Sequence, residues 1–286
     1  MCYSCINEIE KPLSKASIMN KLLIIDPQND FCDESNTPNK PALPVTGAYN
    51  DIVRIAGFIE SLSPKIGSIV VTLDSHPAVA IERPGFWMDA DGQAIEPFTT
   101  ISSSDIKSAK YITRNPLMKD HALAYTKALE KGGKYQLMVW PTHCVLGTWG
   151  HAMPNVLADA LLNWETVGQI AVKKVLKGMN PLTEQYSAVS AEVSEEADIN
   201  WDLIESVRPI KGELLFVAGE ASSHCVRATM LDIFPVLSSE ELSRVVLLTD
   251  CMSPVSGFES QSKAFIEEAK QMGVQVMTAA QAIQSI

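Results

Sequence analysis

Residues 214–226 read LLFVAGEASSHCV, an apolar run followed by a polar turn that ends at Cys225. The run 214–218 is typical of a buried strand, and the residues after Cys225 have the apolar spacing of a helix. The start of a helix carries free N–H groups and partial positive charge, which lower a thiol pKa and can hold an oxyanion. Cys225 is therefore a candidate nucleophile, although a small buried residue at a helix start gives the same pattern.

Strand-like and helical patterns alternate along the rest of the chain. Apolar, β-branched runs lie at 22–25, 69–72, 137–139, 170–175, 214–217, 245–248 and 274–277. Apolar residues three and four apart lie between them, at 48–62, 120–129, 158–164, 226–234 and 260–272. This alternation predicts an α/β fold of the Rossmann-like kind, a three-layer sandwich with a mostly parallel central sheet and helices on both faces.

The chain is long enough for one large domain with an insertion. We expect an N-terminal extension at 1–19 and a single folded domain over 20–286. The segment at about 77–135 is longer than a simple crossover between strands needs, so we expect it to form an insertion over the edge of the sheet where ligands bind.

Charge and hydropathy limit the partners. The net charge of -11 argues against nucleic acid, because Lys and Arg supply most of the affinity for phosphate backbones. No apolar run approaches the roughly 20 residues of a membrane span, and residues 1–19 lack the pattern of a signal peptide. We expect a cytoplasmic protein whose partner is a small molecule.

The six cysteines are spread along the chain and form no dense disulfide framework, so we expect them to be reduced. Cys2 and Cys5 form a C-x-x-C motif, but no second pair lies nearby to complete a zinc site.

Reactive residue types follow the apolar runs one after another. In parallel sheets, ligands bind beyond the carboxyl ends of the strands, so the residues directly after strands are the ones to inspect. In chain order these are Asp26, Asp74 with His76, His143, Lys177 and Cys225. We expect these side chains to meet at one edge of the sheet.

Five motifs together resemble one family. They are 26–31 (DPQNDF), 74–77 (DSHP), 140–145 (WPTHCV), 177–178 (KG) with 186–188 (YSA), and 221–226 (ASSHCV). In this order they resemble the nicotinamidase branch of the isochorismatase-like cysteine hydrolases, over residues 21 to about 260.

The resemblance implies a catalytic triad of Asp26, Lys177 and Cys225. Asp26 would take the thiol proton, while Lys177 would stabilise the thiolate and the developing negative charge. The resemblance also implies an oxyanion hole formed by the backbone N–H groups of Ala221 and Cys225, arranged by a cis peptide between Glu220 and Ala221. The implied reaction hydrolyses a small amide through a thioester and releases ammonia.

The resemblance further implies a divalent ion bound by Asp74, His76 and His143. Asp-x-His places two ligands on alternate positions after a strand, and imidazole with carboxylate suits zinc first, with iron or manganese as alternatives. Phe31 and Trp140 match positions whose rings flank the substrate ring, and Tyr186 would support the pocket. Relatives commonly form homo-oligomers, so we expect one here.

Several alternatives stay open. Glu82 could be an additional metal ligand, and Arg83 beside it could indicate an anionic substrate. Glu220 occupies a position where relatives carry an apolar residue. Instead of a nicotinamide-like amide, the substrate could be an N-carbamoyl or ureido compound, and a non-catalytic binding protein could retain the same fold. His224 is expected to pack against or orient its loop.

Overall fold

The computed structural model describes residues 19–33, 38–132, 136–194 and 198–286. Residues 1–18 of the expected N-terminal extension, with Cys2 and Cys5, lie outside the described residues. None of the described helices is long and apolar enough to cross a membrane.

A six-stranded sheet forms the centre of the molecule. Its strands lie in the order β10-β9-β8-β1-β2-β7, and every neighbouring pair is parallel. The strands are β1 (Asn20–Ile25), β2 (Ile66–Asp74), β7 (Lys173–Lys177), β8 (Leu215–Gly219), β9 (Val245–Leu248) and β10 (Gln275–Met277).

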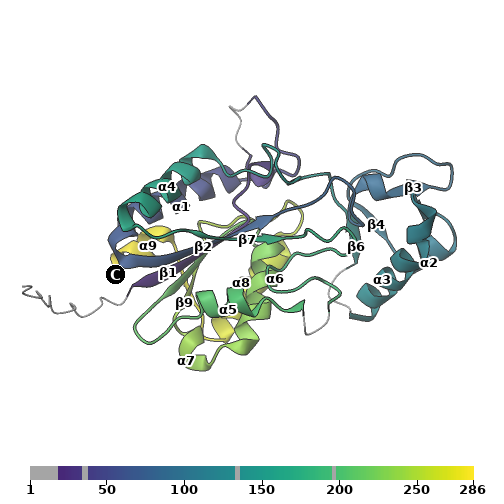
Figure 1. Ribbon diagram of the computed structural model, residues 1–286. Helices are drawn as coiled ribbons and strands as arrows, with labels where there is room; N and C mark the ends of the chain where they lie inside the picture. Colours follow the sequence, from purple (N-terminus) through teal and green to yellow (C-terminus); the bar gives the residue numbers. More distant parts are fainter. Residues whose placement is uncertain (1–18, 34–37, 133–135, 195–197) are drawn as a thin grey trace, which may run out of the picture.

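Helices cover both faces of this sheet (Figure 1). One face carries α1 (Ala48–Leu62), α4 (Asn155–Gly168) and α9 (Ala279–Gln284). The other carries α5 (Trp201–Val207), α6 (Cys225–Ile233), the short α7 (Ser239–Leu242) and α8 (Glu259–Gln271).

Alternate residues of β1 pack into the two opposite cores, Leu22 and Ile24 into one, Leu23 and Ile25 into the other. A strand buried on both faces must be apolar throughout, which explains the uninterrupted run. The three-layer α/β prediction is confirmed.

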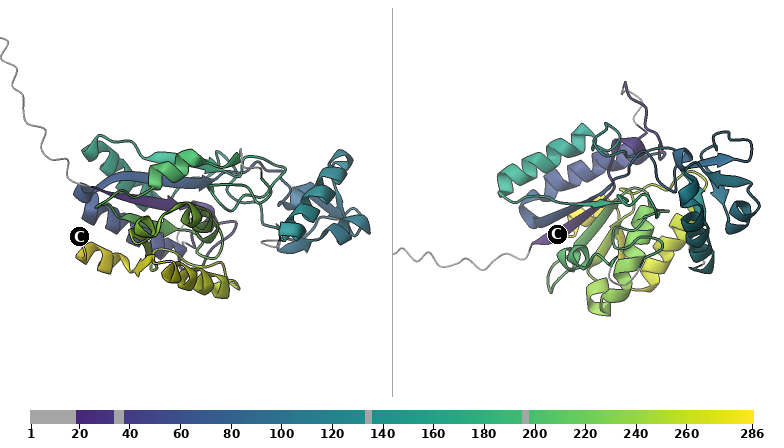
Figure 2. Two further views of the ribbon diagram at one scale, coloured as in Figure 1. Left: turned by 90° about the horizontal axis from the view of Figure 1, so that it is seen from below. Right: turned by 45° about the vertical axis from the view of Figure 1, so that its right-hand side comes forward.

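The segment between β2 and β7 forms a separate lobe beyond the carboxyl ends of the strands (Figures 1 and 2). It contains β3 (Trp87–Asp89), β4 (Thr99–Ile101), α2 (Ser103–Lys107), β5 (Tyr111–Thr113), α3 (Lys119–Gly132) and β6 (Leu137–Val139). The lobe has its own small core, in which Trp87 is fully buried.

The prediction that the run 137–139 is a strand of the central sheet is wrong. β6 pairs antiparallel with β4, and its residues Leu137 and Val139 belong to the core of the lobe. A three-residue apolar run carries no information about its partner, because pairing is a non-local property. His143 therefore follows a strand of the lobe, and the lobe extends past the expected boundary at about residue 135.

Candidate active site

The register of the sheet brings residues at or just after the ends of four strands to one edge. Asp74, the last residue of β2, pairs with Lys177, the last residue of β7. Ile25 at the end of β1 pairs with Gly219 at the end of β8, so Asp26 lies near the turn that leads to Cys225. Gly219 has φ 114°, and a Cβ there would lie 2.0 Å from the carbonyl oxygen of Ile25, so only glycine fits.

Lys177 lies at the centre of the site. Its Nζ is 2.9 Å from Oδ2 of Asp26, 2.8 Å from Oδ1 of Asp74 and 3.6 Å from Sγ of Cys225. Burial alone would lower the Lys177 pKa, but the charges of Asp26 and Asp74 outweigh it and hold that pKa well above its ordinary value. The ammonium therefore stays charged, and it connects the carboxylate of Asp26 to the thiol of Cys225.

Asp26 is fully buried and adopts a left-handed backbone conformation with φ 46°. Thr72 on β2 donates a hydrogen bond of 2.6 Å from its hydroxyl to Oδ1 of Asp26. Burial raises the pKa of Asp26, and Lys177 and this hydrogen bond oppose the rise. The sequence analysis missed Thr72, although a hydroxyl residue within the otherwise apolar run 69–73 is the signal that could have indicated it.

The expectation of a lowered thiol pKa at Cys225 is wrong. Burial raises the Cys225 pKa well above its ordinary value, because desolvation of a thiolate outweighs the favourable charge of Lys177. Cys225 begins α6 and lines a pocket with only 8% of its surface exposed. The resting form is thus the thiol.

Two backbone N–H groups, those of Ala221 and of Cys225 itself, were expected to form the oxyanion hole. The expected cis peptide between Glu220 and Ala221 is present. Within the described ranges, the N–H groups of Ala221 and Cys225 donate to no other residue, so both remain available to an oxyanion.

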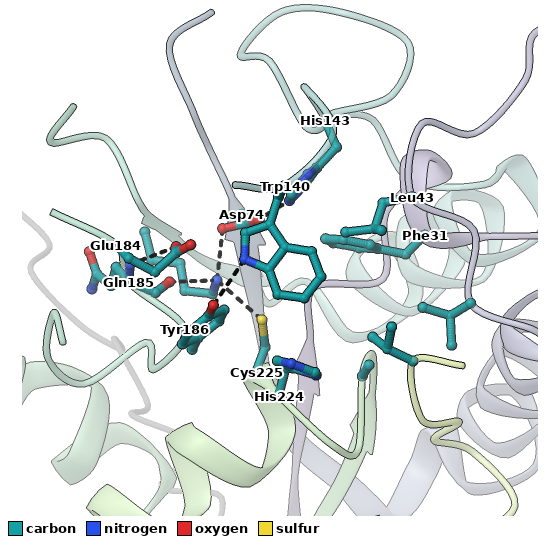
Figure 3. Close-up of a pocket in the computed structure, with 14 residues that line it drawn as sticks. Phe31, Leu43, Asp74, Trp140, His143, Glu184, Gln185, Tyr186, His224 and Cys225 are labelled. Carbon is teal, nitrogen blue, oxygen red and sulfur yellow. Dashed lines mark hydrogen bonds and ion pairs between the residues drawn. The ribbon is translucent and has the colours of Figure 1, made fainter. Parts of the chain in front are cut away.

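The pocket next to the thiol is walled by rings (Figure 3). Phe31, Trp140 and Tyr186 all line it, and Trp140 donates a hydrogen bond of 2.9 Å from Nε1 to the hydroxyl of Tyr186. His224 also lines it, at right angles to Trp140 with ring centroids 5.3 Å apart. Burial lowers the pKa of His224 to about 4, so its ring is neutral at pH 7. The sequence analysis did not assign His224 to the pocket wall.

Asp74, His76 and His143 converge as a possible ligand set for a cation. Oδ2 of Asp74 lies 2.8 Å from Nε2 of His76 and 3.2 Å from Nε2 of His143. Nδ1 of His143 lies 2.7 Å from the carbonyl oxygen of Pro141. One carboxylate and two imidazoles are donor types that suit a divalent ion such as zinc.

Gly178 permits the close packing of this set. It follows Lys177 with φ 78°, and a Cβ there would lie 2.6 Å from Cε1 of His76.

Arg83 and Glu82 lie behind this set, both fully buried. Nη1 of Arg83 is 3.1 Å from Nδ1 of His143. Burial first and the Arg83 charge second lower the His143 pKa to about 3. Arg83 does not line the pocket, so the alternative in which it binds an anionic substrate is not supported.

Glu184 lines the pocket on the same side as Asp74 (Figure 3), and the sequence analysis missed it. Burial, followed by the charge of Glu82, raises its pKa to about 8. Its sequence neighbours are polar loop residues, which gave no signal of a buried carboxyl group.

Comparison with known proteins agrees with this geometry. No family model matches the chain. The nicotinamidase of Saccharomyces cerevisiae is 24% identical over 261 residues, covering 91% of this chain and 99% of that protein. A solved structure of yeast nicotinamidase, 23% identical, has a TM-score of 0.59 and covers the same shares of both chains. An isochorismatase-like hydrolase from Alkaliphilus metalliredigens, 18% identical, has a TM-score of 0.51 over 93% of this chain and 98% of its own.

This chain has the isochorismatase-like hydrolase fold. The match to yeast nicotinamidase along nearly the whole chain confirms the resemblance to the nicotinamidase branch. A pyrazinamidase of Pyrococcus horikoshii, solved in complex with zinc, is also similar, with 21% identity and a TM-score of 0.51 over 91% of this chain and 98% of its own.

Proposed function

We propose that the chain is a cysteine amidohydrolase that removes ammonia from a small planar amide of the nicotinamide type. The observation that carries this proposal is the position of Lys177 Nζ, within 2.9 Å of the Asp26 carboxylate and 3.6 Å of the Cys225 sulfur, beside a pocket walled by aromatic rings. The sequence match to yeast nicotinamidase supports the same reaction class.

In the first half of the reaction, Sγ of Cys225 attacks the amide carbon while the thiol proton passes to Asp26. Because the resting thiol has a raised pKa, this transfer belongs to the attack and does not precede it. Lys177 stabilises the negative charge, and the N–H groups of Ala221 and Cys225 bind the oxyanion. Asp26 then protonates the amide nitrogen, the C–N bond breaks, and ammonia leaves a thioester behind.

In the second half, water attacks the thioester carbon. Asp26 accepts a proton from that water, the carbon–sulfur bond breaks, and the proton returns to the sulfur of Cys225 as the carboxylic acid leaves. The sum is one amide and one water converted to one acid and one ammonia.

Phe31, Trp140 and Tyr186 would hold the flat ring of the substrate. Asp74, His76 and His143 would hold a divalent ion, zinc first, with iron or manganese as alternatives. Such an ion would supply a Lewis acid toward a polar atom of the substrate. The zinc complex of the similar pyrazinamidase supports a metal of this kind.

The test is release of ammonia from nicotinamide by the purified protein, with and without added zinc. We expect Cys225→Ala to lose activity by at least about 10³-fold, because the nucleophile is gone. Cys251→Ala is the matched control, since Cys251 is buried away from the pocket. If the wild-type protein releases no ammonia from nicotinamide or from a panel of aryl and alkyl amides, the proposal is contradicted. Activity on N-carbamoyl or ureido compounds alone would favour that alternative.

A homo-oligomer, a cytoplasmic location and the division into an extension at 1–19 and a hydrolase domain at 20–286 stay predictions.

A further inference from the structure

His76 contacts acidic residues through both of its ring nitrogens. Nε2 lies 2.8 Å from Oδ2 of Asp74, in the ligand set described above. Nδ1, on the opposite edge of the ring, lies 3.2 Å from Oε1 of Glu82. The ligand atoms of His76, Glu82 and Glu184 all lie within 4.8 Å of one another. Glu82 therefore faces away from the ion site formed by Asp74 and His143.

The carboxyl groups of Glu82 and Glu184, which lie on the Nδ1 side of His76, are buried and lack some hydrogen-bond partners. Glu82 is 0% and Glu184 6% exposed. Oε2 of each has no hydrogen-bond partner among the described residues, and neither does Nδ1 of His76. A buried polar atom without a hydrogen-bond partner destabilises the fold, more so when it is charged, so a group that satisfies several such atoms at once is favoured here.

The guanidinium of Arg83, which is also nearby, does not fill this role. Nε of Arg83 is 3.7 Å from Oε1 of Glu82, and it lacks a hydrogen-bond partner itself. The remaining nitrogens of Arg83 lie against His143.

We propose that His76, Glu82 and Glu184 form a second position for a divalent cation, an alternative to the set Asp74, His76 and His143. A neutral imidazole has one lone pair, so His76 can serve only one set at a time. Binding through Nδ1 puts the ring proton on Nε2, where Oδ2 of Asp74 lies 2.8 Å away to accept it. A carboxylate behind a ligating histidine is the usual support for such a ligand.

Glu184 is held in place for this role. Its backbone N–H donates a hydrogen bond of 2.8 Å to the hydroxyl of Tyr125 on α3, and its Oε1 accepts one of 2.9 Å from the N–H of Gln185. Oε2 is thus the atom left to a ligand. One nitrogen and two carboxylate donors suit zinc or manganese.

The test measures zinc binding to the metal-free protein, by competition with a chromophoric chelator. We expect Glu184→Gln to weaken binding by roughly 10- to 100-fold or more, as loss of a ligand should exceed the effect of losing a supporting residue. Gln preserves the acceptor for Gln185. Glu96→Gln, an exposed carboxylate of the lobe, is the control and should bind zinc like the wild type.

Cobalt gives a second readout, since its visible absorption should change in Glu184→Gln and not in Glu96→Gln. If Glu184→Gln proves unfolded without metal, Glu184→Asp, which retains the charge with a shorter reach, should also bind zinc more weakly. Zinc affinity and cobalt spectra that respond to His143→Asn but not to either Glu184 variant would overturn the proposal, leaving Glu82 as a hydrogen-bond acceptor for His76. These measurements do not involve amide hydrolysis, so they stand apart from the proposed function.

Discussion

Single side chains decide how well Asp26 can act as a base. Its Oδ1 accepts a hydrogen bond of 2.6 Å from Thr72, and its Oδ2 faces Lys177 at 2.9 Å. Both contacts lower a pKa that burial raises. Without them, a buried carboxyl would stay protonated and could not accept the thiol proton.

We predict that Thr72→Val moves the acidic limb of the kcat/KM profile to higher pH and lowers kcat/KM at pH 7, by about 10-fold or more if general-base catalysis by Asp26 is impaired. The hydrogen bond from Thr72 lowers the Asp26 pKa, so its loss should raise that pKa. The measurement is the pH dependence of ammonia release. Thr126→Val should leave the profile unchanged, because among the described residues the buried Thr126 hydroxyl donates only within its own helix in the lobe.

At the scale of elements, the lobe between β2 and β7 supplies walls of the site from outside the sheet. Trp140 follows β6, and its backbone N–H donates a hydrogen bond to the carbonyl oxygen of Glu82. This bond connects the pocket wall to the segment that carries Glu82. Trp87 is fully buried in the core of the lobe, and its Nε1 donates a hydrogen bond of 2.6 Å to the carbonyl oxygen of Ile81.

We predict that Trp87→Ala destabilises the lobe by about 3–5 kcal/mol, the usual cost of a buried aromatic truncation. Hydrogen exchange should accelerate in β3 to β6, and change little in β1, β2 and β8, whose cores are separate. Leu117→Ala is the control, because Leu117 is 84% exposed. Equal acceleration throughout lobe and sheet would show that the two unfold together.

Over the whole molecule, buried titratable groups oppose one another in their effect on stability. The depressed pKa of His224, about 4 against 6.5, removes stability as pH falls through that window, because only the unfolded chain takes up the proton. Glu220 acts in the opposite direction. Burial, with the charge of Asp51, raises its pKa well above 4.5, so stability is full below 4.5 and falls as pH rises.

We predict that Glu220→Gln raises the thermal unfolding midpoint at pH 8 and changes it little at pH 5. Gln mimics the neutral carboxyl without titrating, so it removes the alkaline loss. The measurement is calorimetry at both pH values, with the exposed Glu60→Gln as control. A midpoint at pH 8 that stays at or below the wild-type value would contradict the raised Glu220 pKa.

The α/β class and most strands could be predicted because each strand is a local apolar run, and strand tips are where such sheets bind ligands. The motifs also named Asp26, Lys177 and Cys225, which do converge on one edge. The partner of β6 could not be predicted, since three apolar residues fit several sheets equally well. Thr72 and Glu184 were missed because neither belongs to a motif, and each matters only through a residue distant in sequence.

The amino-acid sequence by itself determined the class of fold, most of its strands and the residue types at their tips, because hydrophobic periodicity and residue chemistry are local properties. Only the tertiary structure decided the charge state of the resting thiol, the contact of Lys177 with two carboxylates, and the position of Glu82 and Glu184 on the far edge of His76. These depend on burial and on distances between remote residues, and desolvation and Coulomb energy depend on both.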